Sequence, residues 1–127
     1  MKQIKFDNRF KEAILNKEKV ATIRNNKKVD VGEDFIIVDA NNIHIAEAEC
    51  IGVLRFNSER FFIELEERVA SFPDVNIALF INENHQPVVG VRNSELGFNN
   101  WQEALYSYKT YLKNEHCYLH IFELFED

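Results

Sequence analysis

Three side chains that could do chemistry fall close together, between residues 19 and 24. They are Lys19, Thr22 and Arg24, which supply an amine, a hydroxyl and a guanidinium. Thr22 and Arg24 are two residues apart, so in a β-strand they share a face, and the long stem of Lys19 lets its amine reach that face. These three groups on one surface could then bind an anionic or carbonyl-bearing ligand, and could also attack it as a nucleophile. The plainer interpretation is that the two cations are solvated strand-edge charges and that Thr22 is simply a good strand former.

Attack on a ligand would need two further groups besides the hydroxyl. A threonine is a weak nucleophile until a base removes its proton, and a lysine with a lowered pKa can be that base. A carboxylate would then move the proton or orient the substrate, and Glu95 is the candidate because it lies in a polar loop. Aromatic residues near it could stack on a base, although core packing is the alternative for each of them: Phe98, Trp101, Tyr106 and Tyr108.

The residue patterns of other common catalytic and binding sites are absent from this sequence. His116 and His120 would share a strand face, but about 13 Å would separate them, too far to hold one metal ion without a bend. Glycine-rich phosphate loops, Ser-His-Asp patterns and dinucleotide fingerprints are absent from the sequence. We therefore expect no metal site and no cofactor.

Length and composition bound the class of protein. The 127 residues fit one compact domain, and 46% hydrophobic with 28% charged residues is ordinary for a soluble globular protein. No stretch approaches the roughly 20 apolar residues of a membrane span, and the N-terminus has no apolar run of a signal peptide. Cys50 and Cys117 lie in apolar, strand-like contexts and need not pair. We expect a cytoplasmic protein with no membrane partner.

The net charge of −6 is unevenly distributed along the chain. Residues 1–28 hold nine Lys or Arg against three acids, and the remainder holds six against eighteen. The acidic total argues against strong binding to a long nucleic acid, because such affinity comes from phosphate neutralisation. The basic first quarter leaves room for a local site that takes one phosphate or a short strand. The alternative is that the two parts neutralise each other across the fold.

Apolar periodicity predicts the elements that would position these side chains. Strands are expected over residues 2–6, 20–25, 35–40, 44–56 and 116–125, with a bulge at Gly52 and a hairpin turn at residues 41–42. Helices are expected over residues 8–17, 59–71 and 101–114, capped by Asp7 or Asn8, by Ser58, and by Asn99 or Asn100. Residues 75–81 fit a buried strand or a short helix, and residues 88–92 fit a short strand or a covering loop. Short strands joined by tight turns suggest a small barrel or a strongly curled sheet.

Two segments resemble the start of the ASCH family, small β-barrel domains similar to PUA domains. They are residues 14–24, Ile-Leu-Asn-Lys-Glu-Lys-Val-Ala-Thr-Ile-Arg, and residues 31–35, Val-Gly-Glu-Asp-Phe. The likeness continues through Leu96-Gly97-Phe98, the helix around residues 101–111 and the aromatic-rich last strand. It implies an α+β class protein with a PUA-like mixed or antiparallel β-barrel of five to six strands, flanked by about three helices. It also implies a single domain over residues 1–127 with an insert at about 60–92.

The family's hallmark is a Gly-x-Lys-x-x-Glu-x-Arg pattern, and this chain matches it in part. Lys19 and Arg24 are kept, Lys17 stands where Gly is usual, and Thr22 stands where Glu is common. Threonine at that position resembles small bacterial members that hydrolyse amides of N4-acylated cytidines with a Lys, this Thr and a downstream Glu. That Glu directly precedes the Gly-Phe pair, whereas this chain has Leu96 there and Glu95 one position earlier.

The resemblance implies two functions. In the first, the domain binds RNA or a modified nucleoside or nucleotide in a cleft around Lys19, Thr22 and Arg24. In the alternative, it is an amidohydrolase of N4-acylcytidine-type nucleosides with Lys19 as base, Thr22 as nucleophile and Glu95 as the carboxylate. We favour binding, because Glu95 is displaced by one position, and the oligomeric state stays open. The expected ligand contacts are Lys17, Arg24, Asn25 and Phe98.

Overall fold

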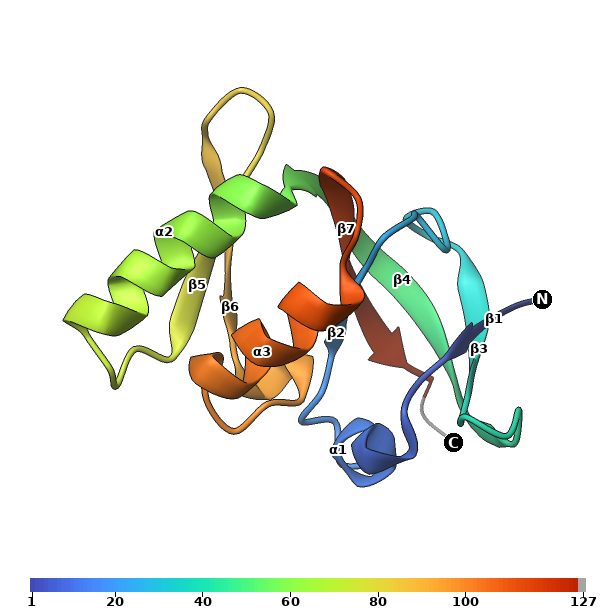
Figure 1. The fold of residues 1–127 in the computed structure, drawn as a ribbon. Coiled ribbons are helices and arrows are strands. Elements are labelled where there is room, and N and C mark those ends of the chain that lie inside the picture. The colour runs from blue at the N-terminus through green and yellow to red at the C-terminus, as the bar shows by residue number, and fades with distance from the viewer. Residues whose placement is uncertain (126–127) are drawn as a thin grey trace.

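The computed structural model describes residues 1–125 and confirms the α+β class (Figure 1). Its main sheet curls into a half-barrel of five strands in the order β1-β3-β4-β7-β2. The strands are β1 (Lys2–Lys5), β2 (Ala21–Arg24), β3 (Asp34–Val38), β4 (His44–Asn57) and β7 (His116–Leu124). β1 pairs with β3 in parallel, and the other pairs are antiparallel. The mixed, curled sheet agrees with the predicted PUA-like architecture.

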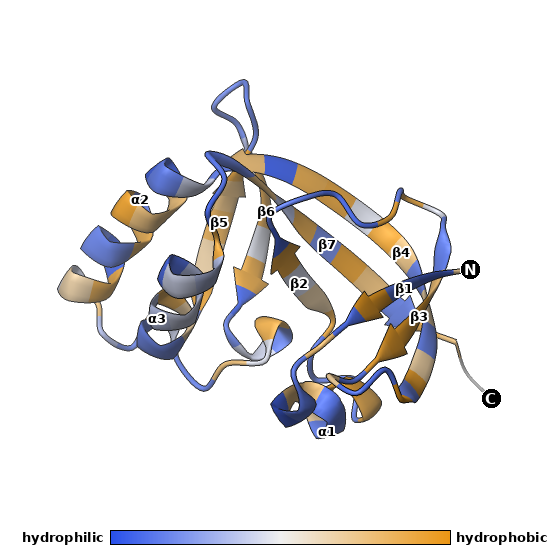
Figure 2. Ribbon diagram, turned by 45° about the vertical axis from the view of Figure 1, so that its right-hand side comes forward, coloured by the Kyte–Doolittle hydropathy of each residue, from blue (hydrophilic) through white to orange (hydrophobic). Residues whose placement is uncertain are grey.

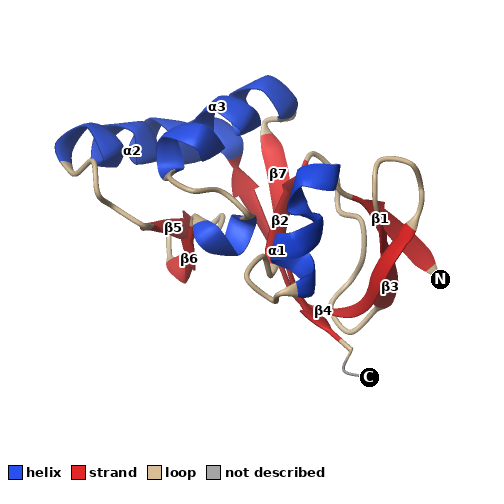
Figure 3. Ribbon diagram, turned by 90° about the horizontal axis from the view of Figure 1, so that it is seen from below, coloured by secondary structure: helices blue, strands red, loops and turns tan. Residues whose placement is uncertain are grey.

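A second layer lies beside this sheet. It contains a two-stranded antiparallel sheet, β5 (Ile77–Ile81) and β6 (Pro87–Arg92), so both ambiguous segments form strands. Figures 1 and 3 show α2 (Ser58–Ser71) and α3 (Trp101–Tyr111) together on this side of the molecule, away from the short α1 (Lys11–Leu15). Two 3₁₀ turns, η1 (Asn8–Phe10) and η2 (Ser94–Leu96), precede α1 and α3 respectively. Residues 60–92, the expected insert, therefore supply α2 and the small sheet.

The helix ends follow local capping chemistry, with one correction. The side chains of Asp7 and Asn100 accept backbone N–H groups at the starts of η1 and α3, as side-chain caps do. The predicted Ser58 cap of α2 is wrong by one residue, because Asn57 accepts the N–H of Arg60 at 2.9 Å. The Ser58 hydroxyl is instead directed to the carbonyl oxygen of Asn114 at 2.7 Å. A register shift between Cys50 and Gly52 confirms the bulge in β4.

Two hydrophobic cores hold the layers together. One joins α2, α3 and the β5–β6 sheet to β2, β4 and β7, around buried Phe56, Phe80 and Trp101. The other lies between α1 and the curled sheet, around Ile14 and Phe35. Figure 2 shows hydrophobic residues at repeated positions along the strands that contribute side chains to these cores. The partly buried ring of Phe10 packs against both cores, so the segment before Lys19 marks the line where they meet.

Candidate functional site

The predicted Lys-Thr-Arg cluster is centred on the edge strand β2. Thr22 pairs with His120 of β7, and Arg24 pairs with Tyr118, in an antiparallel register. The alternation of the strand puts Thr22 and Arg24 on one face, where the Arg24 Nε donates to the Thr22 Oγ1 at 3.0 Å. Thr22 is buried, and the Arg24 guanidinium lies 4.7 Å from the centroid of the Phe6 ring. The hydroxyl and the guanidinium are thus fixed as one unit.

Lys19 is a buried lysine with only 3% of its surface exposed. Its Nζ donates to the carbonyl oxygens of Ala21 at 2.8 Å and Leu96 at 2.6 Å, and it lies 4.6 Å from the centroid of the Phe10 ring. Burial lowers the pKa of the Lys19 amine well below its ordinary value, and the positive charges of Arg24 and Arg9 lower it further. Such an amine gives up its proton more readily than a surface lysine.

These three residues line one cleft of about 490 Å³, a volume typical of small-molecule sites. The cleft lies between the two hydrophobic cores, since its walls include Phe6 from one and Ile23 from the other. The other lining residues come from the N-terminal segment, the turn after β3, the loop before α3, and α3 itself: Lys5, Asp7, Arg9, Phe10, Ala40, Phe98, Ser107, Tyr108 and Tyr111. Four of the lining side chains are cationic and one, Asp7, is acidic. The cleft therefore favours an anionic or oxygen-rich ligand.

Aromatic rings form the walls of the cleft. The predicted contact Phe98 lies edge-to-face with Phe10 at 5.6 Å and with Tyr108 at 5.3 Å between centroids. Burial raises the pKa of the Tyr108 hydroxyl, although the charges of Arg24 and Arg9 oppose that rise, so the group stays a protonated donor. Of the other aromatic candidates, Trp101 is fully buried in the core and Tyr106 is 80% exposed outside the cleft.

Glu95 lies away from this cleft. Its carboxylate accepts the backbone N–H of Arg92 at 2.9 Å, and its backbone carbonyl accepts the N–H of Val20. It lines a separate pocket of about 440 Å³, together with the other predicted residue Lys17. Only Lys19 lines both pockets. Leu96, which follows Glu95, buries its side chain completely, and its carbonyl oxygen accepts a hydrogen bond from Lys19.

Asn25, a predicted ligand contact, connects the end of β2 to the end of α3. Its Oδ1 accepts the backbone N–H of Lys113 at 2.7 Å and that of Asn114 at 3.2 Å, and its Nδ2 donates to the carbonyl oxygen of Tyr111 at 3.2 Å. These bonds satisfy backbone groups just after α3, which explains why that helix ends three residues before the predicted position. Asn25 thereby holds Tyr111 at the wall of the cleft.

We expect the substitution Asn25→Ala to lower the free energy of unfolding by about 1–3 kcal/mol, because three hydrogen bonds are lost and helix-end groups lose their partners. Urea unfolding of the variant measures this loss. Asn41→Ala, which changes an exposed turn residue without these bonds, is the matched control. An Asn25 variant as stable as the control would contradict the structural role.

Arg9 and Phe10 are the main cleft residues that the sequence interpretation missed. The Arg9 guanidinium lies 4.6 Å from the centroid of Phe10 and 5.3 Å from that of Phe98, which is cation–π distance. In the sequence, Phe10 fits the apolar stripe of a helix and Arg9 its solvated face. The basic charge of residues 1–28 was the available signal, but it did not single out Arg9.

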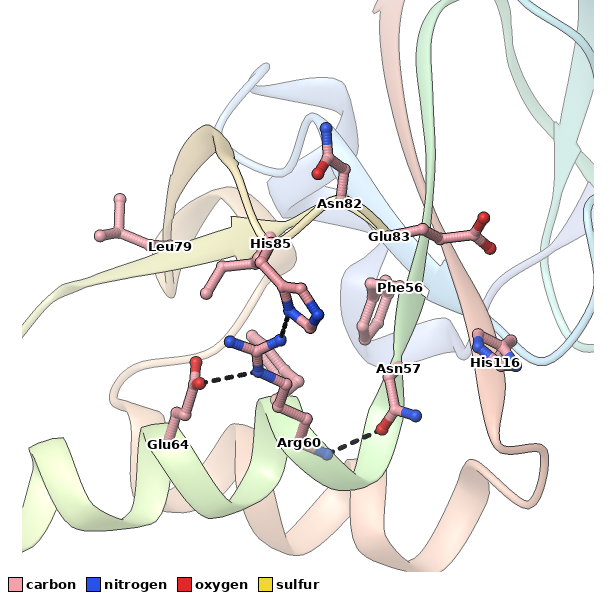
Figure 4. A pocket seen from close by; sticks show the side chains of 11 residues that line it. Phe56, Asn57, Arg60, Glu64, Leu79, Asn82, Glu83, His85 and His116 are labelled. Atoms are coloured by element: carbon pink, nitrogen blue, oxygen red, sulfur yellow. Dashed lines mark hydrogen bonds and ion pairs between the residues drawn. The ribbon is translucent and has the colours of Figure 1, made fainter.

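A third cavity, of about 300 Å³, lies between the start of α2 and the β5–β6 turn (Figure 4). Its charged groups largely pair with acids close by. Arg60 donates to Glu64 at 3.0 Å and contacts the ring of His85, and Arg55 donates to Glu83 at 2.5 Å. Among residues 1–125, by contrast, no carboxylate forms an ion pair with a cation of the cleft around Lys19. Uncompensated charge therefore distinguishes that cleft from the cavity at α2.

Residues 1–125 contain neither a cluster of metal-binding side chains nor a membrane-spanning helix. No group of three or more His, Cys, Asp or Glu side chains is placed to hold a metal ion. No helix there has both the length and the apolar character needed to cross a membrane.

Comparison with known proteins places the fold. No family model matches the sequence, and a search of curated proteins finds no match. The crystal structure of an ASCH protein from Zymomonas mobilis is similar over 95% of this chain, with a TM-score of 0.55 and 13% identity; the chain spans 65% of that protein. An ASCH domain from Lactobacillus crispatus JV V101 aligns over 92% of this chain and 70% of its own, with a TM-score of 0.49 and 16% identity. The chain therefore has the ASCH fold that the sequence resemblance predicts.

Proposed function

We propose that the cleft around Lys19, Thr22 and Arg24 binds RNA or a modified nucleoside or nucleotide without changing it chemically. The observation that carries this proposal is a cleft of about 490 Å³ that combines aromatic walls with cations lacking carboxylate partners among residues 1–125. Nucleic-acid ligands offer both of the matching features, a flat base and anionic or carbonyl oxygens. The ASCH fold is consistent with this proposal.

Each part of the cleft has a role in this proposal. Arg24 is held by Phe6 and Thr22, so its terminal nitrogens can donate to base carbonyl or phosphate oxygens at little entropic cost. The protonated Tyr108 hydroxyl offers another donor, and Phe98, of which 4% is exposed, forms part of the aromatic wall against which the base would lie. The buried Lys19 forms the base of the cleft, where its hydrogen bonds to the carbonyl oxygens of Ala21 and Leu96 hold these two backbone segments together.

The substitution Arg24→Gln tests this proposal most directly. We expect it to weaken binding of a short mixed-sequence single-stranded RNA about 10- to 100-fold, because charge-assisted hydrogen bonds contribute roughly 1.5–3 kcal/mol each. Fluorescence anisotropy with labelled RNA at several salt concentrations measures the affinity and its salt dependence. The control Arg92→Gln removes the same charge from an exposed residue of β6 outside the cleft. Equal affinities for the two variants would refute the proposed role of the cleft.

The amidohydrolase remains the second candidate because of one feature of Lys19. A neutral amine has two N–H groups and one lone pair. The carbonyl oxygens of Ala21 and Leu96 take both N–H groups, so the lone pair is left to accept a proton. Thr22 accepts a hydrogen bond from Arg24, which leaves its own hydroxyl proton to be removed.

In that mechanism the Thr22 oxygen attacks the acyl carbon while Lys19 takes the hydroxyl proton. The bond from the acyl carbon to the cytosine amine then breaks, the amine leaves with the proton, and water hydrolyses the threonyl ester. The carboxylate predicted for such a site, Glu95, lines the other pocket, and the acidic residue that does line this cleft, Asp7, caps η1. For this reason binding without chemistry is the favoured function.

Incubation with N4-acetylcytidine separates the two functions. Release of cytidine by the native protein and not by Lys19→Met would establish the amidohydrolase. Binding of RNA or nucleoside without turnover would support the binding function. If the protein neither binds nor hydrolyses these ligands, both functions are wrong.

A further inference from the structure

Arg9 is positioned at the cleft by its own turn. The Asp7 carboxylate accepts the Arg9 backbone N–H at 3.0 Å, which fixes the start of η1. The guanidinium then lies against Phe10 and Phe98, and its Nη2 makes a long hydrogen bond of 3.5 Å to the Ser107 hydroxyl. Arg9 is an exposed residue that lines the cleft, and among residues 1–125 its guanidinium forms no other hydrogen bond. Arg9 is thus held in place while most of its hydrogen-bonding capacity stays available.

The cleft concentrates like charge around Arg9. Lys5, Arg9 and Arg24 line it together, and the one acidic lining residue, Asp7, caps η1. The charges of Arg9 and Arg24 both act on Lys19 and on Tyr108, so the two arginines flank the same space. Two surface arginines elsewhere pair with carboxylates, Arg60 with Glu64 and Arg55 with Glu83, whereas Arg68 and Arg92 form no ion pair within residues 1–125. Like charges gathered without counter-charge favour the binding of an anion.

We propose that Arg9, assisted by Lys5, binds the phosphate group of a nucleotide whose base lies near Arg24 and Phe98. This inference rests on the proposed binding function and adds that the ligand carries a phosphate. Arg9 presents the planar set of donors that matches phosphate oxygens. The η1 turn carries Arg9 on the N-terminal side of the cleft, and its guanidinium reaches across to Ser107 of α3. The cleft accordingly prefers a nucleotide over the corresponding free nucleoside.

Isothermal titration calorimetry with matched ligands tests this preference. The probes are the four common ribonucleosides, their 5′-monophosphates, and dinucleotides whose single phosphate is an internal diester. For the base that binds best, we expect the monophosphate or the dinucleotide to bind about tenfold or more tightly than the nucleoside. The two phosphate ligands distinguish a free nucleotide from a segment of RNA as the source of the phosphate.

Variants then assign the preference to Arg9. In Arg9→Gln the ratio of phosphate-ligand to nucleoside affinity should fall towards one, and Arg9→Lys should keep part of it because the charge remains. Arg92→Gln should leave the ratio unchanged. Equal binding of nucleoside and nucleotide by the native protein, or an unchanged ratio in Arg9→Gln, would overturn this inference and leave the binding function intact. If no nucleoside, nucleotide or dinucleotide binds, the proposed function fails and this inference fails with it.

Discussion

Replacing Gly97 with alanine is expected to lower the free energy of unfolding by about 2–4 kcal/mol and to disturb the floor of the cleft. Gly97 has a φ of +93°, in the left-handed region that side chains rarely adopt. A Cβ at this position would lie 2.7 and 2.8 Å from two ring carbons of Phe10 and 3.0 Å from the Cδ of Lys19. Both neighbours are packed, so they can yield only by moving the residues that form the site.

The matched control for this substitution is Gly32→Ala. Gly32 also has a positive φ, +86°, but no atom lies within 4 Å of the position where its Cβ would be. The free energy of unfolding of Gly32→Ala should therefore fall only by the cost of placing an alanine in the left-handed backbone conformation, roughly 1–2 kcal/mol. Urea unfolding gives both losses, and titration with the RNA or nucleotide ligand shows that only the Gly97 variant loses affinity. Equal losses of stability in the two variants would mean that the close packing of Gly97 has no energetic consequence.

Substitution of His120 by glutamine is expected to remove much of the acid sensitivity of the protein. His120 lies on β7 opposite Thr22, has 1% of its surface exposed, and accepts the backbone N–H of Lys28 at 3.0 Å through its Nε2. Burial, with a further contribution from the charge of Arg24, lowers the pKa of His120 to about 4 from an ordinary value of 6.5. The folded protein thus keeps this ring neutral over a range in which the unfolded chain protonates it.

The sign of the pH effect follows from this difference. Between about pH 6.5 and pH 4 the unfolded state binds a proton that the folded state does not, so the free energy of unfolding falls as the pH falls. The difference between the two pKa values corresponds to a loss of about 3 kcal/mol by pH 4. Above the ordinary pKa neither state is protonated and this loss disappears.

Urea unfolding at several pH values from about 7 down to 4 measures this effect. Glutamine can still accept the Lys28 N–H but cannot titrate, so His120→Gln should flatten the acid side of the stability profile. His120→Leu should flatten it equally and be less stable at every pH, because the Lys28 N–H loses its partner. If His120→Gln retained the full acid loss, other groups would be its source.

The parts of the site that depend on local spacing could be predicted from the sequence. Thr22 and Arg24 share a face because a strand alternates, and the Lys-x-x-Thr-x-Arg stretch needs no distant residue to be recognised. The place of Glu95 could not be predicted in this way. It depends on the η2 turn and the left-handed Gly97, which direct the Leu96 carbonyl, and not the Glu95 carboxylate, towards Lys19.

Contacts between segments that are distant in the sequence could not be predicted from local sequence patterns either. Arg9 meets Phe98 and Ser107 across the cleft, and Ser107 lies 98 residues further along the chain. Residues 75–81 were ambiguous for a different reason. Ala78 and Phe80 are buried while Ile77 and Leu79 are exposed, so both faces of β5 are apolar and the alternation carries no signal.

The position of β2 in the sheet has a consequence for the order of folding. In the described part of the chain, this strand pairs with β7 alone, and nearly 100 residues separate Thr22 from its partner His120. Closing so long a loop is entropically unfavourable until the intervening strands have formed a template. During synthesis, β2 has no partner until residues 116–124 leave the ribosome. The ligand cleft should accordingly be among the last features to assemble, and a nascent chain that ends before β7 should lack a ligand site.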